Sequence, residues 1–144
     1  MRLLLDTHVV LWLLYAPSRL PQPLVQDLLL GRFEVFVSLV SAWEVAIKHS
    51  LIRPDGSRKL ACSATDFLAD AQLAGCRILP LASAHCMRVE RLPYREHPVT
   101  GRVHSDPFDR MLIAQAAAEP LRIVTADALL ALHEVDVPGL IERI

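Results

Sequence analysis

The sequence contains little cysteine, and its cysteines form no recognisable site. The 144 residues include three, Cys62, Cys76 and Cys86. An odd number argues against a disulfide framework, and the absence of a C-x-x-C pair argues against a cysteine zinc site. This usage is typical of the reducing cytoplasm, which is where we expect the protein.

The sequence also lacks an excess of positive charge. Fifteen Lys and Arg stand against 16 Asp and Glu, for a formal net charge of -1. Proteins that bind nucleic acid over a whole basic surface are therefore excluded, and any phosphate-binding surface must be local.

No apolar run is long enough to cross a membrane. The N-terminal stretch MRLLLDTHVVLWLLY is interrupted by Asp6 and His8. It is shorter than the roughly 20 apolar residues of a spanning helix, and no small-residue cleavage site follows it. We predict a buried strand turning into a helix, without export or membrane association.

The chain has the size of one domain, which we place over residues 1–144, and its 53% hydrophobic residues suffice for a core. Apolar segments predict strands at 2–5, 33–37, 77–79, 121–124 and, more weakly, 136–144. Segments of helical period lie at about 8–15, 21–30, 39–50, 65–74, 82–91, 106–119 and 126–132. This alternation predicts an α/β fold, a three-layer α/β/α sandwich with a central parallel sheet of about five strands. The polar stretches 53–59 and 93–103 are expected to be surface loops.

Four acidic residues follow the predicted strands or begin the helices after them. Asp6 comes directly after the first strand and Asp127 lies just beyond strand 121–124. Asp109 stands in the first turn of its helix, and Glu44 lies one turn into the helix after the second strand. Because ligands bind beyond the carboxyl ends of parallel strands, we expect these carboxylates to converge on one rim of the sheet.

Each acid also has an ordinary structural explanation. Asp6 and Asp127 suit helix caps, and Asp109 suits a capping arrangement at its own helix. Glu44 precedes Lys48 by four residues, the favourable order for a helical ion pair. These alternatives stay open residue by residue, while the shared placement of the four acids indicates a site.

Clustered carboxylates repel each other unless a cation neutralises them. Oxygen ligands without His or Cys favour Mg²⁺ or Mn²⁺ over zinc. Such ions activate water and stabilise charge on a phosphoryl group, so hydrolysis of phosphodiesters is the reaction we infer.

Four motifs in order, LLLDTHVVLWLL, VSLVSAWEVAIK, HSDPFDRMLIAQA and IVTAD, resemble the PIN domain, in particular the VapC-type toxins of bacterial toxin-antitoxin pairs. They span the chain from Leu3 to Asp127. The resemblance implies a PIN-like fold and a Mg²⁺- or Mn²⁺-dependent endoribonuclease that releases 5′-phosphate and 3′-hydroxyl ends. By the same matching, Asp6, Glu44 and Asp109 would be catalytic metal ligands and Asp127 the fourth, more variable one.

The matching extends to neighbouring polar residues. Thr7, Ser41 and Thr125 would orient ligands or water through hydrogen bonds. Asp106 falls on the other acid of the DPFDR motif, where we expect a helix cap with an outer role at the metal. For Arg110, contact with substrate phosphate and pairing with a neighbouring acid are both open.

The sequence departs from the family pattern at residues 94–103, YREHPVTGRV, which separate Pro93 from His104. In relatives the flanking segments are usually close together. A basic, mobile loop here would bring Arg95 and Arg102 to the RNA backbone and supply local positive charge. The alternative is an ordinary solvated loop.

The other rings receive structural interpretations. His8 lies two residues after Asp6 and could approach the acids, but we favour a structural role for it over metal ligation. His85 lies on a helical segment with no second ligand pair at metal spacing. Trp12 and Trp43 occupy apolar helix positions expected in the core.

The resemblance also implies three partners: an RNA substrate, an antitoxin whose C-terminal segment lies over the acidic groove, and a second copy in a homodimer. Two rival functions remain. One is a catalytically silent PIN-fold module that binds RNA or protein. The other is a phosphoacceptor regulator, which would need a lysine beyond a late strand, and no Lys follows Lys59.

Overall fold

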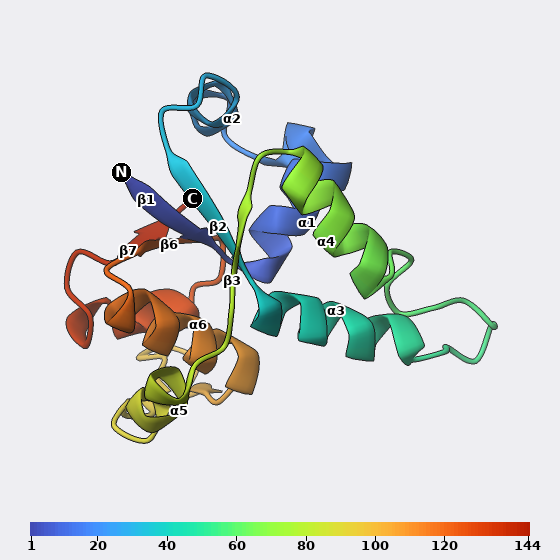
Figure 1. Cartoon of the computed structure of the whole chain (residues 1–144). Coiled ribbons are helices and arrows are strands. Elements are labelled where there is room, and N and C mark those ends of the chain that lie inside the picture. The colour runs from blue at the N-terminus through green and yellow to red at the C-terminus, as the bar shows by residue number, and fades with distance from the viewer.

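A five-stranded parallel sheet forms the centre of the protein, whose residues 1–144 are all described by a computed structural model (Figure 1). The strand order is β3-β2-β1-β6-β7, and every neighbouring pair is parallel. The strands are β1 Arg2–Leu5, β2 Glu34–Ser38, β3 Arg77–Leu79, β6 Arg122–Thr125 and β7 Ile141–Arg143. The predicted α/β fold with a parallel sheet flanked by helices is confirmed.

The predicted helices agree with the structure to within one or two residues, except near the C-terminus. They are α1 Thr7–Tyr15, α2 Gln22–Leu29, α3 Leu39–Ser50, α4 Ala64–Leu73, α5 Ser83–Val89 and α6 Pro107–Ala118, with 3₁₀ turns η1 Pro17–Arg19 and η2 Leu130–Val135. The segment expected near 126–132 therefore lies later, as a 3₁₀ helix. Asp127 accepts from the amides of Leu129 and Leu130 and so caps the turn that leads into η2.

Alternate side chains of the strands pack into two separate cores. Leu3 and Leu5 of β1 join the core beneath α1, α3 and α4, while Leu4 between them joins the core beneath α6. All three leucines are at most 1% exposed, and each contributes roughly 1.5–3 kcal/mol by leaving water. Burial on both faces fixes the position of β1 along its own axis within the sheet. Asp6, the residue that follows β1, is therefore placed at the rim.

Residues 95–104 form an antiparallel hairpin, where we expected an irregular surface loop. Its strands are β4 Arg95–Glu96 and β5 Val103–His104. Gly101 lies at the end of the turn with φ +67, a backbone conformation that favours glycine. The His97 ring accepts hydrogen bonds from the amides of Val99 and Thr100, both at 3.2 Å. The hairpin could not be predicted from the sequence, because strands of two residues are too short to show an alternation of apolar and polar residues.

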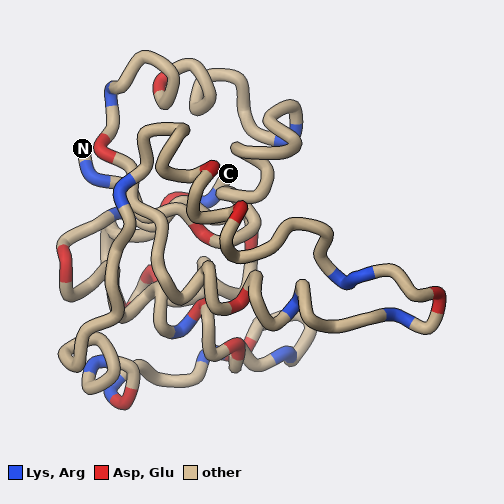
Figure 2. The backbone as a smooth tube through the Cα atoms, turned by 45° about the vertical axis from the view of Figure 1, so that its right-hand side comes forward, with Lys and Arg blue, Asp and Glu red and all other residues tan.

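The segment between α3 and α4 projects from the body of the molecule (Figures 1 and 2). A bridge between Ile52 and Arg58 closes its base, and Lys or Arg positions occur along both of its arms (Figure 2). None of the helices has the length and apolar character needed to span a membrane.

Candidate functional site

Asp6 is buried at the carboxyl end of β1, with a side chain only half satisfied. Its backbone amide donates to Val124 O at 3.0 Å, which continues the pairing of β1 with β6. Its Oδ2 accepts a hydrogen bond of 2.7 Å from Thr125 Oγ1, whereas Oδ1 is buried without any partner. Asp6 occupies the N-cap position of α1, yet its side chain makes no capping hydrogen bond. The carboxylate is thus directed into the site instead of serving the helix.

The environment of Asp6 disfavours its charged form. Its pKa is raised to about 6, mainly by burial and next by the nearby negative charge of Asp109. The hydrogen bond from Thr125 and the charge of His8 oppose this effect, and Glu44 adds to it. Asp6 therefore carries its negative charge at a cost that an added cation would remove.

Glu44 is a second buried carboxylate with a free oxygen. It lies on α3 and is 4% exposed. Its Oε1 accepts from Lys48 Nζ at 2.5 Å, so the ion pair predicted from the sequence is present. Its Oε2 is buried without a partner. One lysine therefore leaves half of this carboxylate available to a ligand.

Asp106 and Asp109 divide two tasks at the start of α6. Asp106 Oδ1 accepts from the amides of Phe108 at 2.8 Å and Asp109 at 3.3 Å, the expected N-cap. Asp109 Oδ2 instead lies 3.2 Å from His104 Nε2. Burial raises the pKa of Asp109, as do the charges of Asp106 and Asp127, against the hydrogen bond with His104.

Asp127 lies at the edge of this group and acts as a cap. Its Oδ1 accepts from the amides of Leu129 at 2.6 Å and Leu130 at 3.3 Å. Its own amide donates to Thr125 Oγ1 at 2.9 Å. The capping alternative is realised here, while the influence of Asp127 on the pKa of Asp109 places its charge near the site.

The four acids share one rim but do not form a closed ligand set. Their charges act on one another, yet in this structure no three His, Cys, Asp or Glu side chains stand together as they would around a bound metal ion. Repulsion between carboxylates favours such spacing. The donors nevertheless fit a hard cation, because all are oxygens and because Asp6 Oδ1 and Glu44 Oε2 are buried without partners.

Behind the acids, two hydroxyls are paired. Thr7 Oγ1 donates to Ser41 Oγ at 2.9 Å, and both residues are at most 1% exposed. This bond joins the first turn of α1 to α3, so it holds the helix starts that carry Asp6 and Glu44 in a fixed relationship.

The three arginines considered for substrate binding have different surroundings. Arg110 is buried, donates to the carbonyls of Leu92 at 2.5 Å and Pro93 at 3.0 Å, and stacks 4.1 Å from the centre of the Tyr94 ring. This geometry favours a structural role for Arg110 over contact with phosphate or with an acid.

The other two arginines belong to the hairpin. Arg95 forms an ion pair with Asp136 through both carboxylate oxygens. Arg102 is exposed, and it lines a hollow of about 390 Å³ together with Asp127 and Leu129. Arg102 is thus the arginine that remains available beside the acids.

The family model of the PIN domain matches residues 3–136. The chain belongs to the PIN domain family. Members of this family are typically nucleases and generally use divalent metals. No curated protein matches the sequence.

Two solved structures share the fold of this PIN domain. A chain of the VapBC2 complex from Rickettsia felis, bound to a fragment of promoter DNA, superposes with a TM-score of 0.62 at 14% identity, covering 99% of this chain and 98% of that one. A chain of DNA-bound VapBC from Salmonella typhimurium gives a TM-score of 0.60 at 17% identity, with the same coverage. At these identities the likeness concerns the fold.

The sequence did not point to three residues that are linked to Asp109 by hydrogen bonds. His104 and His133 are fully buried and joined by a hydrogen bond of 3.0 Å, and His133 Nδ1 lies 2.8 Å from Asp136 Oδ2. His104 stands just before DPFDR, which was the one available signal. His133 and Asp136 are distant from His104 in the sequence, and only the folded structure brings them together with it.

The expectation that Trp43 lies in the core of the PIN domain is wrong. Its side chain is 59% exposed and contacts Phe108 edge to face, with ring centres 5.2 Å apart. Leu39 and Ile47, four residues to either side on α3, are also exposed. The apolar face of α3 extends further around the helix than its buried side requires. Trp12, in contrast, packs against the core as predicted.

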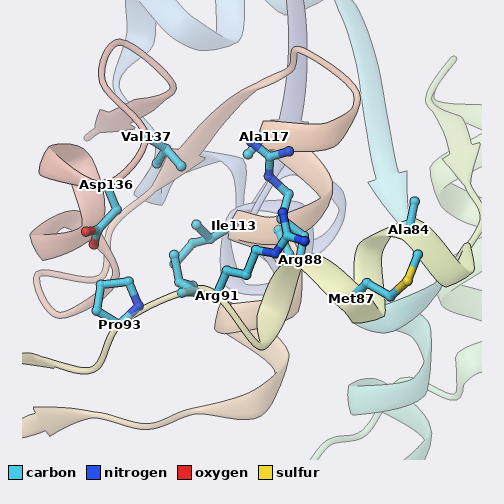
Figure 3. Close-up of a pocket in the computed structure, with 11 residues that line it drawn as sticks. Ala84, Met87, Arg88, Arg91, Pro93, Ile113, Ala117, Asp136 and Val137 are labelled. Carbon is cyan, nitrogen blue, oxygen red and sulfur yellow. The ribbon is translucent and has the colours of Figure 1, made fainter.

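A larger hollow of about 450 Å³ lies between α5, α6 and the segment after η2 (Figure 3). Arg88 and Arg91 stand on one side of it, and Asp136 and Val137 on another (Figure 3). Its floor includes Ile113 of α6. The hollow reaches Asp136 but none of the four acids.

Proposed function

We propose that this PIN domain is a Mg²⁺- or Mn²⁺-dependent endoribonuclease and the toxin component of a toxin-antitoxin module. The observation that carries the proposal is the pair of buried, unpartnered oxygens, Asp6 Oδ1 and Glu44 Oε2, at the carboxyl edge of the sheet. An unsatisfied buried carboxylate oxygen costs free energy, so retaining two at one rim favours a functional use. Family membership and the VapBC-like fold support the same proposal.

Asp6, Glu44 and Asp109 would hold the cation, with Asp127 at the outer edge of the group. A divalent ion bound there would supply the activation of water and the stabilisation of charge on the phosphoryl group. Thr125 orients Asp6 through its hydrogen bond, and Asp106 fixes the helix start that carries Asp109. Lys48 neutralises one oxygen of Glu44 and leaves the other free.

The hairpin would help to bind RNA. Arg102 places an exposed positive charge at the hollow that Asp127 lines, where an RNA backbone approaching the acids would pass. Arg95 lies on the same hairpin but is already paired with Asp136. We therefore assign phosphate contact first to Arg102.

The partners proposed are an antitoxin and a second copy of this chain. Both structural neighbours come from complexes named VapBC, which supports an antitoxin partner. We propose that this antitoxin covers the acidic rim. The exposed apolar side chains of α3, Leu39, Trp43 and Ile47, are the surface we expect at the contact between two copies. We expect these complexes to act in the cytoplasm.

The test is incubation of total RNA with the purified protein in Mn²⁺, in Mg²⁺ and in EDTA. Asp6→Asn removes one charge at the site, and Asp27→Asn, at a surface ion pair with Arg32, is the matched control. We expect discrete fragments with 5′-phosphate ends from the wild type and the control, only with metal. Folded wild type that binds Mn²⁺ but cuts no RNA would instead support the silent binding module.

A further inference from the structure

A buried chain of side chains runs from Asp109 to the hairpin. His104 Nε2 lies 3.2 Å from Asp109 Oδ2, His104 Nδ1 lies 3.0 Å from His133 Nε2, and His133 Nδ1 lies 2.8 Å from Asp136 Oδ2. Arg95 of β4 donates hydrogen bonds to both carboxylate oxygens of Asp136. The series therefore begins at a proposed metal ligand, passes through His104 of β5 and ends at Arg95 of β4, so both strands of the hairpin take part in it.

The chain is shielded from solvent along its middle. The side chains of His104 and His133 are 2% and 0% exposed, and those of Asp109 and Asp136 are 14% and 9% exposed. The two rings meet edge to face, with centres 5.0 Å apart. Buried polar groups are held tightly by their partners because water cannot replace a lost hydrogen bond.

Each member of the chain fixes the next one. The Asp136 carboxylate accepts from His133 Nδ1–H, which leaves His133 Nε2 to accept from His104 Nδ1–H. His104 then presents Nε2 to Asp109.

We propose that His104 and His133 are positioning residues for Asp109, and that the Arg95–Asp136 pair makes this positioning depend on the hairpin. Asp109 stands in the first turn of α6 without a capping task, because Asp106 does that work. The carboxylate would otherwise be free to rotate away from Asp6 and Glu44. The inference rests on the proposed function in one respect, namely that Asp109 is a metal ligand.

The consequence is that residues remote from the acids affect metal binding. Loss of a partner that orients a ligand typically weakens metal affinity roughly 10- to 100-fold. We expect Asp136→Asn, which loses the charge that holds both His133 and Arg95, to weaken Mn²⁺ binding by about 10-fold. Arg95→Gln acts one step further out and should weaken it less.

Two conservative changes at His104 separate its two contacts. His104→Asn keeps an amide near the position of Nδ1, so it retains the link to His133 but not the donor to Asp109. His104→Gln keeps a donor near Nε2 and loses the link to His133. We expect both to bind Mn²⁺ more weakly, with Asn the weaker of the two. Equal affinity of either variant and the wild type would contradict a relay through both contacts.

His85 is the matched control, because it is equally buried but takes no part in the hydrogen-bonded series from Asp109 to Asp136. It is 1% exposed, accepts from the amide of Ala82 and contacts Glu119. His85→Asn removes a buried ring with similar hydrogen bonds, so it controls for a general loss of stability. We expect its Mn²⁺ affinity to equal that of the wild type.

The experiment is calorimetric titration of each folded variant with Mn²⁺, together with NMR of the Asp109 carboxyl carbon in the metal-free protein. A shifted Asp109 signal and weaker Mn²⁺ binding in the Asp136 and His104 variants, but not in His85→Asn, would support the proposal. An unmoved signal and wild-type affinity in the Asp136 variant would overturn it and leave the nuclease proposal standing.

If the wild type binds no Mn²⁺ and cuts no RNA, the nuclease proposal fails by itself. The carbon signal then decides the positioning claim: a shift on replacing Asp136 retains it, and an unmoved signal ends it.

Discussion

Thr125 and Asp6 are 119 residues apart in the sequence and are joined by a buried hydrogen bond of 2.7 Å at the ends of two neighbouring strands. The same Thr125 oxygen accepts from the Asp127 amide. One hydroxyl thus aligns the first acid of the site and the turn that carries the last one.

Replacing Thr125 by valine should therefore reduce RNA cleavage strongly with little change of shape. We expect a loss of roughly 10- to 100-fold in activity, the usual effect of removing a group that orients a metal ligand. Thr125→Ser keeps the hydroxyl and should retain most activity. The measurement is the initial rate of RNA cleavage at saturating Mn²⁺, and equal rates for the valine and serine variants would contradict the role of the hydroxyl.

Asp6→Asn should stabilise the metal-free protein while abolishing its activity. Burial and the charges of Asp109 and Glu44 raise the pKa of Asp6 to about 6. Removing this charge at neutral pH should raise the free energy of unfolding by on the order of 1 to 3 kcal/mol. Urea unfolding in EDTA measures the change, and a destabilised variant would show that the charge is already compensated.

Mn²⁺ should reverse that order of stability. The wild type should gain about 2.7 kcal/mol at an ion concentration 100 times its dissociation constant, and its melting temperature should rise accordingly. Glu44→Gln removes the other carboxylate with an unpartnered oxygen and should abolish most of this gain. An identical shift in both proteins would place the ion elsewhere.

Arg102→Gln should weaken RNA binding through charge. A single lost phosphate contact lowers the slope of log affinity against log salt by about 0.7 for single strands. Arg32→Gln, at a surface ion pair with Asp27, is the control and should leave the slope unchanged. Binding of fluorescent RNA to the Asp6→Asn background at several salt concentrations gives both slopes.

Asp136 should make stability depend on pH in the acid range. Its hydrogen bond from Arg95, with a further one from His133, holds its pKa below the unfolded value of 3.8. The stabilisation is therefore present above about pH 4 and is lost as the pH falls through the lowered pKa. The difference in free energy of unfolding between wild type and Asp136→Asn should shrink as the pH falls below about 4. A difference that persists at pH 2 would argue against this ion pair as its source.

Much of the fold could be predicted because its signals are local. The strand Arg2–Leu5 is apolar throughout since both faces of β1 are covered, and α6 begins where Asp106 caps it. The hairpin 95–104 was missed because its stability comes from contacts outside its own sequence, such as Arg95 with Asp136. Trp43 was misplaced because the period of α3 shows an apolar face and not what covers it.

The sequence alone determined where the acids stand along the chain, directly after strands or in the first turns of helices, since strand ends and caps depend on neighbouring residues. Only the tertiary structure decided what each acid does. In the folded protein, one oxygen each of Asp6 and Glu44 has no partner, Asp127 caps a turn, and Asp109 contacts His104. These choices depend on hydrogen bonds between residues up to 119 positions apart, which form only when the sheet and its two helical layers have packed.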